Sequence, residues 1–266
     1  MGIINVTPDS FADGGLRVDP DRAVADARRM VEAGADLIDV GGESTRPGAE
    51  PLPADEEWRR VAPVLEGLCG RVGVPVSIDT YKAEVARRAL DLGAAIVNDI
   101  SALAYDPALG PLVAARGAAV ILMHHRGRSA DMYARAEYGD VAAEVAAELG
   151  ARAAAARAAG VRGDRIVVDP GLGFAKRAGH TLAALAGLPA IAALGYPILA
   201  GPSRKSFLTH AVGQVPPAGR VWGTAAAVTA AILFGAHIVR VHDVAEMADV
   251  ARVADAIRAA AGAAAF

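Results

Sequence analysis

The chain has 266 residues, of which 53% are hydrophobic, so its composition excludes intrinsic disorder and its length suits one α/β barrel. The formal net charge of −3 gives no electrostatic reason to expect a nucleic-acid partner. The single cysteine, Cys69, cannot form an internal disulfide, and the sequence shows neither a signal-peptide pattern nor a membrane-length apolar run, which together indicate a cytoplasmic protein.

Short runs of β-branched residues alternate along the chain with longer stretches rich in Ala and Leu. Strands are predicted at Gly2–Asn5, Leu37–Val40, Val76–Asp79, Ile96–Asp99, Val120–Met123, Ile166–Asp169, Ile198–Ala200 and Ile238–Val241. The predicted helices include Asp21–Ala33, Asp55–Leu68, Lys82–Leu92, Val141–Ala159, Leu182–Leu194, Val221–Phe234 and Val244–Ala260. Strands that are apolar throughout are typical of a parallel sheet covered by helices. We therefore predict a single (β/α)₈ TIM-barrel domain over residues 1–266, with an N-terminal plug segment absent or truncated because little precedes Asn5.

Polar residues occur where each predicted strand ends, which in a barrel enzyme is the end that carries the chemistry. One such residue alone is most simply a helix cap, but eight strand ends in succession indicate polar groups around one mouth. Asp79, Asn98 and Asp169 offer acceptors that suit a flat heterocycle with several N–H donors, such as a 2-amino-4-oxopteridine.

A second set of residues suits a multiply charged anion such as diphosphate. Lys205 follows the seventh strand, where barrels often bind phosphate, and Arg46 lies in a long loop. Arg240 and His242 are two residues apart on the eighth strand, so both side chains are expected to point to the same face. The alternative for Arg240 and His242 is a surface arginine and a helix-capping histidine. Asn5 is a plausible oxygen ligand for Mg²⁺, whereas His124 is interpreted as structural because no zinc-type spacing surrounds it.

Seven blocks of this sequence, taken in order, resemble the signatures of the dihydropteroate synthase family. They are Met1–Gly15, Asp39–Gly48, Ser77–Thr80, Val97–Ser101, Asp169–Phe174, Ser203–Phe207 and Arg240–Val244. The resemblance spans nearly the whole chain, and NVTPDSF, GGESTRPG and SRKS are its most specific parts. It implies condensation of 6-hydroxymethyl-7,8-dihydropterin diphosphate with p-aminobenzoate, with Mg²⁺ as cofactor, by C–O cleavage and then attack of the amine.

The resemblance also implies a role for individual residues. The pterin would be held by Asp79, Asn98, Met123, Asp169, Phe174, Lys205 and Arg240. The diphosphate would be held by Arg46, Arg240 and His242, and the metal by Asn5. The p-aminobenzoate would contact Phe11, Thr45, Pro47, Phe174 and Ser206, and the catalytic residues would be Asp13, Lys205 and Arg46. The family is also a target of sulfonamides, and it implies a homodimer formed through the C-terminal helices.

Four positions depart from the family pattern, namely His125, Ala175, Thr181 and Pro202. These departures keep open a paralogue that binds a pterin without turning it over. A methyltetrahydrofolate-dependent methyltransferase would share the pterin-binding barrel, but it would have no diphosphate for Arg46, Arg240 and His242 to hold. A barrel aldolase would want a Schiff-base lysine within a strand, whereas Lys205 lies just past one.

Overall fold

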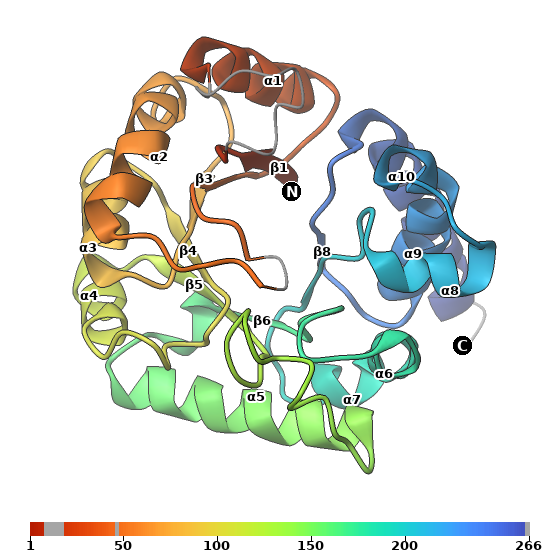
Figure 1. The fold of residues 1–266 in the computed structure, drawn as a ribbon. Coiled ribbons are helices and arrows are strands. Elements are labelled where there is room, and N and C mark those ends of the chain that lie inside the picture. Colours follow the sequence, from red (N-terminus) through yellow and green to blue (C-terminus); the bar gives the residue numbers. More distant parts are fainter. Residues whose placement is uncertain (8–18, 46–47, 264–266) are drawn as a thin grey trace.

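The computed structural model describes residues 1–7, 19–45 and 48–263, and its strands form a ring with helices outside it (Figure 1). The strands are β1 Gly2–Asn5, β2 Ile38–Gly41, β3 Val76–Asp79, β4 Ile96–Asp99, β5 Ala119–Met123, β6 Ile166–Asp169, β7 Leu199–Ala200 and β8 Ile238–Val239. The eight predicted strands are thus confirmed, four of them with the same bounds.

The strands pair in parallel in chain order, from β1 to β6 in one sheet and between β7 and β8 in another. Single bridges join the two sheets at both sides, between Val168 and Ile198 and between Gly2 and Val241. The ring therefore closes, and the predicted barrel is confirmed. All the carboxyl ends of the strands consequently meet at one mouth.

Helices cover the outer surface of the barrel, and α1 and α5 begin at aspartate caps. They are α1 Pro20–Glu32, α2 Ala54–Leu68, α3 Ala83–Asp91, α4 Leu109–Arg116, α5 Val141–Ala158, α6 Ala178–Ala186, α7 Leu188–Ala192, α8 Thr209–Val212, α9 Val221–Leu233 and α10 Val244–Ala263. Asp19 caps α1 by accepting from the Asp21 backbone N–H at 3.0 Å, and Asp140 caps α5 in the same way. None of the helices in the described ranges is long and apolar enough to cross a membrane.

Two helical regions differ from the prediction. The predicted helix Leu182–Leu194 is interrupted at Gly187, because Pro189 starts a new helix and a Cβ on Gly187 would lie 2.4 Å from the Ala142 Cβ of α5. Helix α4 was not among the predicted ranges, and its first turn contains Gly110 and Pro111, which weaken the helical pattern.

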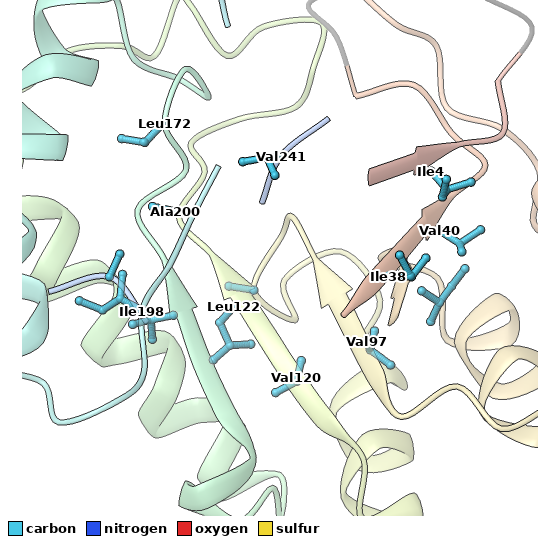
Figure 2. Close-up of a cluster of buried hydrophobic side chains, with 14 of the residues drawn as sticks. Ile4, Ile38, Val40, Val97, Val120, Leu122, Leu172, Ile198, Ala200 and Val241 are labelled. Atoms are coloured by element: carbon cyan, nitrogen blue, oxygen red, sulfur yellow. The ribbon is translucent and has the colours of Figure 1, made fainter. Parts of the chain in front are cut away.

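The main hydrophobic core lies between the strands and the surrounding helices. Figure 2 shows Ile38, Val40, Val97, Val120 and Leu122 of this core on neighbouring strands, and all five are fully buried. A smaller cluster of Met1, Ile121 and Leu199 packs separately. Burial of the outward strand face fixes the alternation of side chains, so the other face of each strand points to the barrel axis.

Candidate active site

Arg240 joins two carboxylates that come from different strands at the mouth of the barrel. Its Nε donates to Asp39 Oδ2 at 2.7 Å, and its Nη2 donates to Asp79 Oδ2 at 2.8 Å. Asn98 on β4 donates from Nδ2 to the same Asp39 oxygen at 3.0 Å. The Asp39 side chain is fully buried, so it holds Arg240 and Asn98 from behind, while the Asp79 side chain remains 17% exposed.

Burial brings the pKa of Asp79 close to neutral pH. Burial raises the pKa of Asp79 from 3.8 to about 7; Asp39 adds to this rise, and Arg240 opposes it. A carboxyl group with such a pKa can accept or donate a hydrogen bond at little cost.

On the other side of the mouth, Asp169 and Lys205 both contact the loop that follows β6. The Asp169 carboxylate accepts from the Gly171 backbone N–H at 2.7 Å. The Lys205 ammonium donates to the Leu172 carbonyl and lies 4.6 Å from the centroid of the Phe174 ring. Burial lowers the pKa of Lys205 to about 8, against the attraction of Asp169, so Lys205 is still mainly cationic at pH 7.

Gly171 sets the path of this loop because no other residue fits there. Its φ is +64°, and a Cβ at this position would lie 2.1 Å from the His124 carbonyl oxygen. That contact is with backbone, which cannot move aside as a flexible side chain can. The glycine therefore lets the loop turn tightly over β5, so that Asp169 and Phe174 border the same space.

His242 and Asn5 line one cavity of about 500 Å³ together with residues of α1 and of the first turn of α10. The backbone N–H of His242 donates to Ser203 Oγ at 3.1 Å, and this hydroxyl lies 3.0 Å from His242 Nδ1. A hydroxyl that donates to Nδ1 leaves the proton on Nε2, available to a ligand. Burial, with Arg204 and Arg240 nearby, lowers the pKa of His242 to about 4, so it offers a neutral donor.

The comparisons with known proteins agree on one family. A family model described as pterin binding enzyme matches residues 1–242. The dihydropteroate synthase of Mycobacterium leprae is 51% identical, over 92% of this chain and 88% of its own length. The Synechocystis sp. synthase is 47% identical, over 93% of this chain and 86% of its own. This chain belongs to the dihydropteroate synthase family.

Solved structures of family members with bound ligands have folds closely similar to that of this chain. Xanthomonas albilineans dihydropteroate synthase with 4-aminobenzoic acid has a TM-score of 0.91 at 46% identity, covering 97% of this chain and 92% of that one. The same enzyme in complex with 7,8-dihydropteroate has a TM-score of 0.87 at 42% identity, covering 97% and 93%.

The seven residues predicted to hold the pterin come from separate strands and loops, and the structure gathers them at the mouth. Met123 ends β5 directly beside Asp169 in the parallel register, and it is buried. Asp79, Asn98 and Arg240 are joined through Asp39, and Lys205 contacts the loop that carries Phe174. What these residues bind stays a prediction.

The structure describes only some of the other predicted site residues. Phe11, Asp13, Arg46 and Pro47 lie outside the described residues. Ser206 is exposed and directly follows Lys205, and the Thr45 carbonyl accepts from Ser129 Oγ at 3.5 Å.

One prediction about the last strand was wrong. Arg240 and His242 do not lie within β8, which ends at Val239. Its partner strand β7 ends at Ala200, because Gly201 and then Pro202 follow and proline has no N–H to continue the ladder.

Sequence reasoning assigned no role to Asp39, Lys176 or Glu148. Asp39 carried a usable signal, because a carboxylate inside the apolar run LIDV requires a buried partner. Glu148 carried none, since a glutamate on a surface helix is ordinary.

Proposed function

We propose that this protein condenses 6-hydroxymethyl-7,8-dihydropterin diphosphate with p-aminobenzoate to give 7,8-dihydropteroate and diphosphate. The observation that carries the proposal is the arrangement of Asp79, Asn98 and Asp169 with Lys205 and Arg240 at one mouth. Membership of the synthase family and the dihydropteroate complex of the Xanthomonas albilineans enzyme support it.

In this proposal the pterin enters the space between Arg240 and the loop after β6. Asp79 and Asp169 accept hydrogen bonds from the ring and exocyclic nitrogens, and Asn98 pairs with an adjacent ring nitrogen. Arg240 and Met123 lie against opposite faces of the ring. Because burial also raises the pKa of Asp169, the N–H donors of a pterin restore solvation that both carboxylates lose in the barrel.

The reaction then begins with cleavage of the bond between the pterin methylene carbon and the diphosphate oxygen. The electron pair leaves with that oxygen, so a pterin cation and free diphosphate form. The p-aminobenzoate nitrogen attacks the methylene carbon and loses a proton to solvent. An aromatic amine is already an unprotonated nucleophile at pH 7, so the protein contributes position and electrostatic stabilisation.

The diphosphate would lie near His242 and Asn5. His242 can donate from Nε2, and the Asn5 amide oxygen is the type of hard ligand that Mg²⁺ accepts. The described residues contain no group of three or more His, Cys, Asp or Glu that could hold a metal ion by themselves. That fits Mg²⁺, which keeps several waters and is often bound jointly by one protein oxygen and substrate phosphates. When bound, Mg²⁺ would neutralise the charge that develops on the leaving diphosphate.

Cleavage before attack predicts that an oxygen label moves without p-aminobenzoate. We would label the oxygen between the methylene carbon and the first phosphorus with ¹⁸O and incubate the substrate with enzyme and Mg²⁺ alone. Reversible cleavage moves the label into non-bridging positions, which mass shifts in ³¹P NMR detect. A label that stays in place while full turnover proceeds with p-aminobenzoate would show that the amine must attack first.

We also propose a homodimer formed through the C-terminal helices. Helices α9 and α10 pack side by side (Figure 1) and carry exposed apolar side chains, with Trp222 83%, Val253 61% and Ile257 49% exposed. Val253 and Ile257 are four residues apart on α10 and share one face. An exposed pair of large apolar side chains on one helix face is typical of an interaction surface.

The double change Val253→Asp and Ile257→Asp is expected to convert the dimer to a monomer, because two carboxylates would be desolvated in each half of the interface. Light scattering after size-exclusion chromatography measures the mass directly. The control is Arg252→Asp, a neighbouring exposed position. A wild-type protein that is monomeric at micromolar concentration would refute the dimer.

We place the protein in the cytoplasm on the sequence features alone.

A further inference from the structure

Lys176 is a buried lysine directly behind the loop that follows β6, and burial lowers its pKa to about 7. Only 2% of its surface is exposed, although a lysine is costly to bury. Its ammonium lies 2.8 Å from His124 Nδ1, 3.1 Å from the Phe174 carbonyl oxygen and 3.3 Å from the Gly171 carbonyl oxygen. The protonated amine has three donors, and each finds one acceptor here.

His124 accepts from the Lys176 amine and is itself held by Glu148 of α5. Since Nδ1 accepts from Lys176, the imidazole proton is on Nε2, which donates to Glu148 Oε2 at 3.0 Å. Burial lowers the pKa of His124, in agreement with a neutral ring. Arg126 Nε donates to Glu148 Oε1 at 3.1 Å, so the carboxylate is fixed on both sides. The series Arg126, Glu148, His124 and Lys176 thus connects α5 to the loop.

The loop itself has a conformation that needs external support. Gly171, Gly173 and Ala175 have φ values of +64°, +81° and +48°. The left-handed region is unfavourable for alanine, so Ala175 is strained. Lys176 donates to the carbonyls of Gly171 and Phe174 within this segment, and Asp169 and Phe174 border the proposed pterin space.

We propose that Lys176 is a positioning residue for pterin binding, which fixes the Asp169 carboxylate and the Phe174 ring through the two loop carbonyls and is itself oriented by His124 and Glu148. This inference rests on the proposed function, because it takes a pterin as the ligand. It differs from a role in core packing alone: an apolar side chain of similar length would fill the same volume, but it would leave the two carbonyls unpaired.

The test is the affinity for 6-hydroxymethylpterin, measured by calorimetry alongside the thermal midpoint of each variant. Lys176→Met is expected to weaken binding by about tenfold or more, as removal of a group that orients a site residue commonly does. Leu65→Ala, a change in the core of α2, is expected to lower the thermal midpoint and leave the affinity within about twofold. Arg177→Ala, the exposed neighbour of Lys176, should change neither quantity.

A second pair of variants tests the connection through His124. In His124→Asn the side-chain oxygen can take the place of Nδ1 as acceptor for Lys176, whereas His124→Leu removes the acceptor. We expect the asparagine variant to bind clearly more tightly than the leucine variant. If Lys176→Met does not fold, this pair decides the question.

Each outcome separates the inference from the function it rests on. Wild-type protein that binds no pterin refutes the proposed function. Wild-type binding that persists unchanged in Lys176→Met, or equal affinities of the two His124 variants, refutes the positioning role and leaves the function intact.

Discussion

Lys205→Met is expected to reduce turnover by about 10²–10³-fold, in the range found when one donor that stabilises developing charge is removed. The ammonium contacts the Leu172 carbonyl and the Phe174 ring, and its charge opposes the rise in the pKa of Asp169. Methionine fills the same space without charge, so Asp169 loses the cation that favours its ionised form.

The measurement is the steady-state rate of dihydropteroate formation at pH 7, with Lys205→Arg as the matched variant. Arginine keeps the positive charge on a longer side chain and is expected to retain part of the activity. The exposed Arg177→Ala change controls for loss of a nearby cation. A normal rate in Lys205→Met would remove Lys205 from the site.

Arg240→Met is expected to destabilise the fold by about 3 kcal/mol as well as to weaken the binding of pterin diphosphate, because removing one partner of a buried ion pair leaves uncompensated charge. Here one guanidinium serves two carboxylates, Asp39 and Asp79, and the Asp39 side chain is fully buried. If Arg240→Met raised only the Michaelis constant for pterin diphosphate and left the stability unchanged, Arg240 would be a residue that only contacts diphosphate.

The pH dependence of this loss has a definite sign. The folded-state pKa of Asp79 is about 7, above its ordinary value of 3.8, so the folded protein binds more protons than the unfolded chain between these values. Stability from this group is therefore present below pH 4 and declines as the pH rises to 7. Without Arg240 the pKa rises further and the decline extends to higher pH.

Urea unfolding of the wild-type and Arg240→Met proteins at pH 6 and pH 8 measures this effect. We expect a larger difference between the two proteins at pH 8, and partial recovery in the double variant Arg240→Met with Asp79→Asn, which removes one unpaired carboxylate. Equal losses at both pH values, with no recovery, would mean that Arg240 does not balance Asp79.

The barrel was predictable because its strands are buried on both faces and therefore read as short apolar runs. The topology then determines where the polar residues lie, because the residues that end the strands of a parallel ring must meet at one mouth. For this reason Asp79, Asn98 and Asp169 could be placed together from sequence.

The interactions among those residues could not be predicted, because they join positions far apart in the chain. Arg240 pairs with Asp39, 201 residues away, and Lys176 with His124, 52 residues away. Nothing in local pattern distinguishes His124 in such a network from any buried histidine. The break at Gly187 likewise depends on the close approach of α5, which is a tertiary contact.

The most direct test is an assay of the purified protein with 6-hydroxymethyl-7,8-dihydropterin diphosphate, p-aminobenzoate and Mg²⁺, following diphosphate release and identifying the pterin product by mass spectrometry. We predict net release that requires both p-aminobenzoate and Mg²⁺, with 7,8-dihydropteroate formed in equal amount. Tight pterin binding without any dihydropteroate would contradict the account and identify a binding protein that does not turn over its ligand.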